Sequence, residues 1–242
     1  MKPKMTLDRV PSRFGVASRT DSRKAIVAGR MKVNGRTVRD PDIWVSPDSD
    51  KFILDGRELK PARKRYLLFY KPKGVLTSHG DPAGRDTIYK YLGDDCKWVS
   101  PVGRLDKDTS GLLLLTNDTP FADFITSPES KVPKTYLVKV NALLSDEVIA
   151  TLSAGVEMKR GDRAQPLSVH RREDRGKYTW LDIVLTEGKN REVRRMMEAV
   201  GFVVLKLVRT SIGPLTLEGL QVGNYRELAS SEISALRRFK SK

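Results

Sequence analysis

The stretch VGRLDKDTSGLLLLTND, Val102 to Asp118, places the most apolar run of the chain directly after a cluster of charges. Leu112 to Leu115 are four consecutive large apolar residues between turn-forming neighbours, which is typical of a short strand buried on both faces. Just before this run, Arg104 and Lys107 flank Asp106. The stretch therefore predicts a buried strand with polar chemistry at its front end.

Asp106 and Asp108 are candidate reactive groups because cations surround them. Opposite charges nearby keep a carboxylate ionised, and an ionised, positioned aspartate can act as a nucleophile or a base. The alternative is an ordinary charged turn that leads into a strand, since structural ion pairs are common. Spacing alone favours the turn.

The segment GRLDKDTSGLLLLTND resembles the catalytic segment of the RsuA-like family of rRNA pseudouridine synthases over sixteen consecutive residues. The resemblance implies that the aspartate of G-R-L-D, here Asp106, is the nucleophile that isomerises uridine to pseudouridine. It also implies that the reaction needs no cofactor.

Composition indicates a globular chain of one or two domains. The 242 residues are 39% hydrophobic and 31% charged, and no run approaches the roughly 20 apolar residues of a membrane-spanning helix. The first ten residues, MKPKMTLDRV, contain no apolar core of a secretory signal. We therefore expect a cytoplasmic protein without a membrane partner.

Cysteine and histidine are too sparse for a disulfide or a clustered metal site. The chain has one cysteine, Cys96, and two distant histidines, His79 and His170. It also lacks a Walker-type phosphate loop and a G-x-G-x-x-G fingerprint. We expect no metal, no nucleotide cofactor and a monomer.

The net charge of +15 is the strongest compositional feature and predicts a polyanionic partner. Residues 1–65 hold 17 of the 45 Lys and Arg but only 8 of the 30 Asp and Glu. The alternative is a surface charged only for solubility, which either sign of charge can supply.

The first quarter predicts a helix followed by two hairpins. Ser18 is a suitable N-cap, Gly29 a suitable stop, and Ala25 to Val27 supply an apolar side. Asn34-Gly35 and Asp55-Gly56 are hairpin turns.

This pattern resembles the S4 RNA-binding domain, a small αα-hairpin module, through Ser18, Arg19, Ala25, Ile26, Gly29, Val33, Asn34 and Gly35. Pro11 within the first helix and Thr6 in place of a basic residue depart from that pattern, so the first helix should be short and the grip on RNA weaker. The polar segment Lys60 to Arg65 predicts a linker, which gives an S4-like domain over 1–61 and a catalytic domain over 62–242.

The second domain predicts an α+β fold with a mainly antiparallel sheet, which is also the fold that the resemblance implies. Strands are expected over 66–70, 75–77, 98–102, 112–115, 134–140, 162–168, 179–185, 202–208 and 225–228. Helices are expected over 88–92, 121–126 with Asp118 as N-cap, 145–154, 190–200 and at the C-terminus. Charged or polar turns are expected over 171–177 and 209–214, and Lys71 is expected in a solvated turn.

Tyr136 lies on the apolar register of the alternating run Lys134 to Val140. By pattern alone it is more plausibly a core tyrosine whose hydroxyl finds a partner. However, K-T-Y at this distance after G-R-L-D resembles the second motif of the family, whose tyrosine lines the active site and stacks on the target base. The resemblance assigns that role to Tyr136.

The segment EGKNREVRRM, Glu187 to Met196, predicts an amphipathic helix with a cationic stripe, whose alternative role is a solvated surface. It resembles the third motif of the family, which supplies an arginine that pairs with the catalytic aspartate. The motif position falls on Arg194, with Arg195 as the alternative. Glu192 stands where a glutamine is common, which should not affect the pair.

The expected function is therefore isomerisation of a specific uridine in ribosomal RNA, or in a ribosome assembly intermediate, with Asp106, Tyr136 and Arg194 as catalytic residues. K-T-Y-L-V and I-T-S-P weakly favour a small-subunit enzyme. The rivals are a non-catalytic RNA-binding assembly factor and an unrelated hydrolase that uses Asp106 and Asp108. The expected RNA-binding residues are Arg19, Arg23, Arg30, Arg36, Arg104, Arg191 and Arg195.

Overall fold

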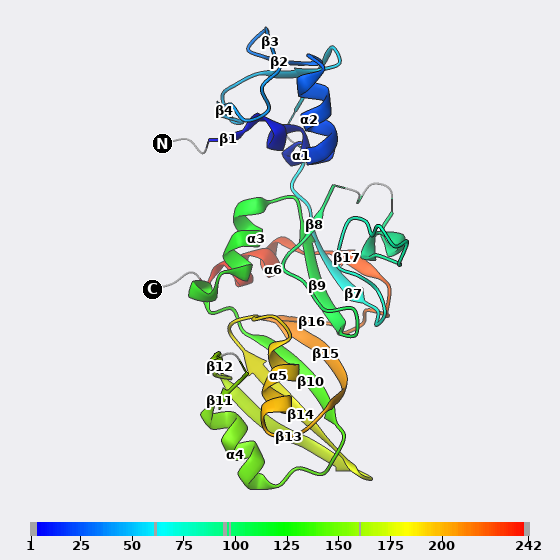
Figure 1. The fold of residues 1–242 in the computed structure, drawn as a ribbon, viewed down its shortest axis with the longest axis vertical. Helices are drawn as coiled ribbons and strands as arrows, with labels where there is room; N and C mark the ends of the chain where they lie inside the picture. Colours follow the sequence, from blue (N-terminus) through cyan, green and yellow to red (C-terminus); the bar gives the residue numbers. More distant parts are fainter. Residues whose placement is uncertain (1–3, 61, 94–95, 97, 160, 240–242) are drawn as a thin grey trace. The chain divides into compact units, whose positions relative to one another are not determined.

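The computed structural model describes residues 4–60, 62–93, 96, 98–159 and 161–239, and the chain forms two compact units (Figure 1). The first unit is Met1–Lys64 with Asp94–Val99, and the second is Arg65–Gly93 with Ser100–Lys242. The chain thus changes unit at Lys64/Arg65, within the segment where the sequence predicts a linker.

The first unit contains the predicted capped helix and both hairpins. The helix is α2 (Arg19–Val27), and Ser18 Oγ accepts a hydrogen bond from the Asp21 N–H at its start. The strands are β2 (Met31–Val33), β3 (Arg36–Val38), β5 (Phe52–Leu54) and β6 (Arg57–Glu58), in the order β3-β2-β5-β6. Asn34 and Asp55 begin the two turns with positive φ, which asparagine and aspartate tolerate.

The start of the first unit is a short turn of helix, as Pro11 requires. A 3-10 turn at Leu7–Arg9 leads into α1 (Val10–Arg13), where Pro11 lies in the first turn and loses no helical hydrogen bond. β1 (Met5–Thr6) precedes these turns and pairs with β4 (Trp44–Val45), which comes later in the chain. Leu7 and Val10 pack with Phe14, Ile26, Met31 and Phe52 in a single core.

The second unit is built on a mainly antiparallel sheet, as predicted. The strands are β7 (Tyr66–Lys71), β8 (Ser100–Pro101), β9 (Ser110–Thr116), β10 (Lys134–Val140), β13 (Ser168–Arg175), β14 (Tyr178–Leu185), β15 (Val204–Ile212), β16 (Leu215–Thr216) and β17 (Tyr225–Glu227). The order is β13-β14-β10-β15-β9-β7-β17, with β16 beside β15 and β8 beside β9. Only the β9–β15 pair is parallel among these described strands.

Gly111 allows β9 to lie against β15. Its φ is +119°, and a Cβ at this position would collide with the backbone of Arg209. Any residue with a side chain would therefore force the two strands apart. The glycine thus fixes the start of the buried strand Leu112–Leu115, whose four side chains are at most 1% exposed.

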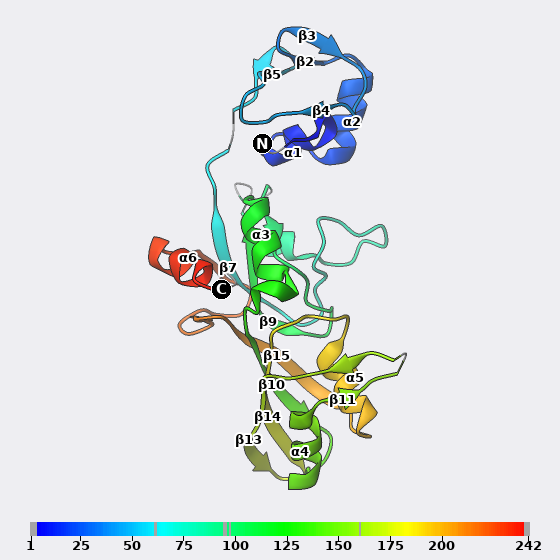
Figure 2. The same cartoon turned by 90° about the vertical axis from the view of Figure 1, so that its left-hand side faces the viewer.

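Helices cover the sheet and define two cores. Both α4 (Asp146–Ala154) and α5 (Glu192–Ala199) lie on one side of β10 and β14 in Figure 2, and their Leu152, Met196 and Met197 complete one core. A second core joins Leu112 and Leu114 to α3 (Thr119–Thr126) and α6 (Ser230–Arg237). The short elements η2 (Ile88–Tyr91), η4 (Pro128–Ser130), β11 (Val156–Glu157) and β12 (Arg163–Ala164) complete the unit.

Two predicted turns are strands. Residues 171–175 belong to β13, because their charged side chains project from the exposed edge of the sheet while their backbone pairs with β14. Residues 209–212 belong to β15, which pairs with β10, β9 and β16 at once. The polar composition of residues 171–175 reflects the exposed edge of the sheet. That of residues 209–212 reflects their position in the floor of a cleft, described below.

Other predicted elements are shorter or differently capped. Residues 75–77 form only an isolated bridge, from Leu76 to Thr87, and the strands predicted over 98–102 and 162–168 shrink to β8 and β12. Asp118 makes no side-chain cap at α3, because its carboxylate accepts a 2.6 Å hydrogen bond from the Tyr66 hydroxyl instead.

Candidate active site

Asp106 lies in the loop before β9, and a buried lysine holds the backbone of that loop. Lys71, at the end of β7, is fully buried. Its Nζ donates hydrogen bonds to the carbonyl oxygens of Pro72, Asp106 and Thr109 at 3.1, 3.1 and 2.9 Å. Burial lowers the pKa of Lys71 to about 8, although the Asp106 and Asp108 carboxylates counteract this. The prediction of a solvated turn at Lys71 was wrong, since three carbonyls replace water around the ammonium.

A cleft of about 710 Å³ opens beside this loop and takes its walls from the second unit alone. Such a volume is within the range of small-molecule sites and is large enough for a nucleotide. Seven lysines and arginines line it: Arg85, Arg104, Lys107, Lys134, Lys189, Arg191 and Arg209. Only three acids do so: Asp81, Asp106 and Glu192. The cleft is thus suited to a polyanion while it presents a carboxylate, Asp106, whose side chain is 30% exposed.

Tyr136 lines the cleft from β10. The strand alternates as predicted, so Tyr136 faces the core side together with Val138 and Val140 and is 8% exposed. Its direct neighbours across the sheet are Ile183 and Arg209. The ring therefore forms part of the apolar wall against which a base could stack.

Among the described residues, Arg191 forms the ion pair with Asp106 that the sequence assigned to Arg194. The Arg191 Nη1 lies 3.9 Å from the Asp106 carboxylate. The difference arises because α5 begins at Glu192, and Arg191 is its N-cap in the left-handed conformation rather than part of the helical stripe. Arg194 instead donates to the backbone carbonyls of Val204 and Asp108, both at 3.1 Å.

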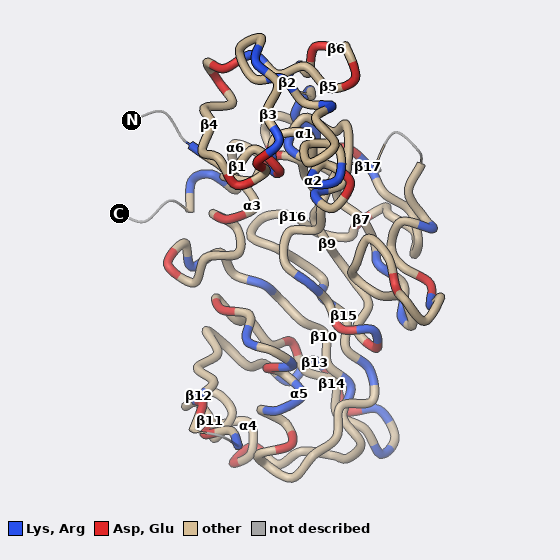
Figure 3. Tube along the Cα trace, turned by 45° about the horizontal axis from the view of Figure 1, so that its top comes forward, with Lys and Arg blue, Asp and Glu red and all other residues tan. Residues whose placement is uncertain are grey.

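Arg194 nevertheless contacts the loop that holds Asp106, through the Asp108 carbonyl, whereas Arg195 has its partners elsewhere. Burial, and then the neighbouring Arg191, lower the pKa of Arg194 from its usual range. Arg195 turns away and pairs with Asp162 at 2.5 Å. In Figure 3, blue segments near α5 in the second unit and near α2 in the first mark Lys and Arg positions.

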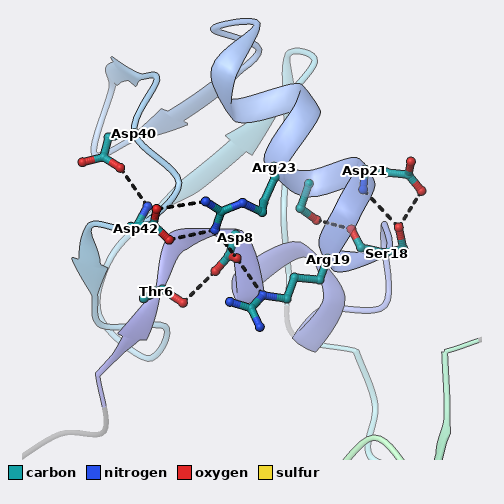
Figure 4. A network of polar contacts seen from close by, with 9 residues as sticks. Thr6, Asp8, Ser18, Arg19, Asp21, Arg23, Asp40 and Asp42 are labelled. Atoms are coloured by element: carbon teal, nitrogen blue, oxygen red, sulfur yellow. Dashed lines mark hydrogen bonds and ion pairs between the residues drawn. The ribbon is translucent and has the colours of Figure 1, made fainter.

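In the first unit, three of the four expected RNA-binding arginines are held by carboxylates. Figure 4 shows two of them, Arg19 and Arg23. Arg19 and Arg23 converge on the buried Asp8 at 2.7 and 2.9 Å. Burial alone would raise the pKa of Asp8, but hydrogen bonds from Thr6, Arg19 and Arg23 lower it to about 2. Arg23 also pairs with Asp42, and Arg30 pairs with Asp55.

Arg36 differs from these three arginines. It is exposed on the β2–β3 hairpin and makes no ion pair with any described carboxylate. Its guanidinium can therefore bind a phosphate without first breaking an ion pair to a described carboxylate.

Two buried ionisable groups lie at the inner end of the cleft. Lys134, 7% exposed, donates to the carbonyls of Val132 and Thr186, and burial followed by Arg209 lowers its pKa to about 8. Burial and then the neighbouring Glu187 raise the pKa of Glu192 to about 8. Glu192 is therefore mostly protonated at neutral pH, when it resembles the glutamine common at this position.

Glu192→Gln should change how stability depends on pH. The folded-state pKa of Glu192 is raised, so between about pH 4.5 and 8 the unfolded chain releases a proton that the folded chain retains. The wild type should therefore lose stability as pH rises through this window, by up to about 1.4 kcal/mol per pH unit. The variant should lack this loss.

Urea unfolding at pH 5, 6.5 and 8 would measure the effect. The free energy of unfolding of Glu192→Gln relative to the wild type should increase with pH, whereas that of Glu198→Gln, on the exposed side of α5, should show no such increase. A constant difference would contradict the prediction.

The described residues hold neither a metal cluster nor a membrane span. No group of three or more His, Cys, Asp or Glu among them could bind a metal ion. Every helix in the described ranges is too short or too polar to cross a bilayer.

A family model for RNA pseudouridylate synthase matches residues 65–199, more than half of the chain. The chain belongs to the RNA pseudouridine synthase family. It is 40% identical over 231 residues to an uncharacterized RNA pseudouridine synthase of Aquifex aeolicus, covering 95% of this chain and 92% of that protein. It is 37% identical over 232 residues to the ribosomal large subunit pseudouridine synthase B of Bacillus subtilis, covering 96% and 95%.

The fold of this pseudouridine synthase also matches a solved member of the family. A crystal structure of a pseudouridylate synthase superposes with a TM-score of 0.70 at 30% identity, and the match covers 96% of this chain and 99% of that one. Membership of the RNA pseudouridine synthase family and the enzyme class expected from the sequence are thereby confirmed.

Several residues of the synthase cleft were not predicted to be functional from the sequence. Lys71, Lys134 and Arg209 are all buried and all occupy strand positions on a core face. Strict alternation in K-T-Y-L-V-K-V places Lys134 on the face of Tyr136, so this one could have been found. Lys71 and Arg209 could not, because their hydrogen-bond partners come from distant parts of the chain.

Proposed function

We propose that the chain isomerises a specific uridine of ribosomal RNA to pseudouridine, with Asp106 as the nucleophile. The observation that carries this proposal is the partly exposed Asp106 carboxylate, which lines a cationic cleft that also holds Tyr136. The glycosidic bond breaks, and the base rotates and rejoins the sugar through C5. Every group this needs is a side chain, so the proposal includes no cofactor or metal.

To enter the cleft, the target uridine must unstack from its neighbouring bases. Unstacking costs a few kcal/mol and least in single strands, so loosely structured RNA is the substrate. Tyr136 would stack on the flipped base. Arg104, Lys107 and Lys189, which are exposed along the cleft, would hold the flanking phosphates.

The large ribosomal subunit is the proposed source of the substrate RNA. The 37% identical Bacillus subtilis relative is named a large-subunit synthase. This replaces the weak preference for the small subunit that the sequence suggested. We further propose that the enzyme acts as a monomer in the cytoplasm.

The proposed function is tested by mapping pseudouridines in rRNA. Carbodiimide mapping in cells that lack this protein, that regain it and that regain only Asp106→Asn would locate the target. One site should disappear and return only with the wild-type chain. An unchanged map in all three strains would overturn the proposal.

We propose that the first unit is an S4-like RNA-binding domain that positions the enzyme on rRNA. Arg36→Gln should lower the slope of log K against log salt by about 0.7 to 0.9, the amount expected for one lost phosphate contact. Arg30→Gln is the matched control, since Asp55 already neutralises that guanidinium. Binding to one rRNA fragment over a series of salt concentrations measures both slopes. Equal slopes in both variants would remove Arg36 from the interface.

Arg191→Ala and Arg194→Ala should affect catalysis by different routes. Arg191 is an exposed partner 3.9 Å from Asp106, so its loss should cost about tenfold or less and fade at high salt. Arg194 ties α5 and β15 to the Asp108 carbonyl, so its loss should displace the loop and cost more than tenfold at any salt concentration. Single-turnover rates on saturating RNA at low and high salt measure this, with Arg175→Ala on β13 as control. The reverse salt pattern would exchange the two roles.

A further inference from the structure

Arg209 is a buried cation with unused hydrogen-bond donors in the floor of the cleft. The residue is 5% exposed and lines the cleft from β15. Its Nε donates to the Leu112 carbonyl at 2.8 Å, but its Nη2 is buried without a hydrogen-bond partner. A guanidinium stays charged in proteins, and a buried donor left unpaired is costly. The fold therefore retains an unfavourable group at the site where substrate binds.

The surroundings of Arg209 do not neutralise its charge. No described carboxylate forms an ion pair with it, and the acid that shares its end of the cleft, Glu192, is mostly protonated at neutral pH. The neighbouring Lys134 has a lowered pKa, for which Arg209 is the second cause after burial. Arg209 and Lys134, which line the cleft and are 5% and 7% exposed, thus bring buried positive charge to this part of it.

The sheet register places this charge beside the proposed base-stacking ring. Arg209 lies directly opposite Tyr136 on β10 and next to Gly111 on β9. Directly opposed residues share one face of a sheet, with Cβ atoms about 5 Å apart. A base stacked on Tyr136 would therefore turn one edge toward the Arg209 guanidinium.

We propose that Arg209 is a further catalytic residue, which donates a hydrogen bond to a carbonyl oxygen of the target uracil and stabilises the negative charge that the base acquires. This inference rests on the proposed function. When the Asp106 carboxylate bonds to C1′, the N1–C1′ bond breaks and its electron pair stays on uracil, spread over N1 and the carbonyl oxygens. C5 of the rotated base then attacks C1′ and releases the carboxylate. C5 loses its proton and N1 gains one, so the product is an isomer.

Arg209 would have the same role if the Asp106 carboxylate attacked the base instead of C1′. Addition of the carboxylate to C6 also places negative charge on a uracil carbonyl oxygen. A fixed donor in a site that excludes water is effective against such a charge, because it needs no reorganisation as the charge develops.

The test varies the stability of the leaving base. An rRNA fragment carries either uridine or 5-fluorouridine at the mapped position, and the fluorine makes the departing base a more stable anion. Single-turnover loss of the target nucleotide is measured at saturating RNA for wild type, Arg209→Gln and Arg175→Gln. We expect Arg209→Gln to slow the uridine reaction about 100-fold. It should slow the 5-fluorouridine reaction by a factor at least ten times smaller. RNA affinity should change by less than about threefold, and Arg175→Gln should behave as wild type.

An equal fold-decrease in rate on both nucleotides would overturn the inference. If Arg209 only held β15 against β9, the effect of its substitution would not depend on the acidity of the leaving base. If Arg209→Gln does not fold, Arg209→Lys, which keeps the charge, is measured on the same pair. A smaller loss on 5-fluorouridine then supports the inference and an equal loss overturns it. A wild-type chain that forms no pseudouridine in the fragment would overturn the proposed function itself, and the inference with it.

Discussion

Asp106→Asn is expected to abolish pseudouridine formation while affinity for RNA stays within a few fold of the wild type. The substitution removes the anionic oxygen that would bond to the substrate and keeps the shape of the side chain. Removing a group that performs the chemical step typically costs at least about 100-fold. The phosphate contacts proposed for Arg104, Lys107 and Lys189 are untouched, so binding should survive.

Asp108→Asn is the matched control for this experiment. Asp108 is an exposed acid two residues further along the same loop, and only its backbone carbonyl is engaged by Arg194. Single-turnover formation of pseudouridine and filter binding of the same RNA would be compared for both variants. Residual turnover of Asp106→Asn above about 1% of wild type would remove Asp106 from the role of nucleophile.

Lys71→Met should nearly abolish turnover and also destabilise the fold. The ammonium is the shared donor for the carbonyls of Pro72, Asp106 and Thr109, and methionine offers none. Each buried acceptor left without a donor costs about 1–3 kcal/mol. The loop would relax, and a displacement of about 1 Å at a reacting group can cost about 100-fold in rate. Urea unfolding and single-turnover rates on the same preparations measure both losses.

Lys73→Met controls for the loss of a positive charge in this segment. Lys73 is exposed two residues after Lys71 and does not line the cleft. Its variant should keep wild-type stability and turnover. If Lys71→Met proves as stable and as active as Lys73→Met, the buried ammonium does not support the catalytic loop.

Local patterns predicted the parts of the fold that depend on local physics. Ser18 caps α2, Asn34 and Asp55 turn the chain, and the alternation of β10 brings Tyr136 to the core side. Each of these features depends on residues within a few positions of one another, so the sequence contains the required information.

The prediction failed where partners lie far apart in the sequence. The arginine that pairs with Asp106 depends on the residue at which α5 begins, because a shift of that start moves Arg191 off the helix and toward the cleft. Lys71 was assigned to solvent because two of its acceptor carbonyls, those of Asp106 and Thr109, lie 35 and 38 residues away. Residues 171–175 and 209–212 appeared polar enough for turns, and only the neighbouring strands show that they are not.

The parallel pairing of β9 with β15 has a consequence for synthesis on the ribosome. It joins Ser110 to Val208 and Gly111 to Arg209, positions about 100 residues apart. β9 and the loop before it, which holds Asp106, leave the exit tunnel long before β15, the strand that must lie against β9. The nascent chain can therefore expose Asp106 but cannot complete the cleft around it until β15, which carries Arg209, has emerged. Under the proposed function, a chain still in synthesis would lack a complete cleft until the strand that carries Arg209 has emerged.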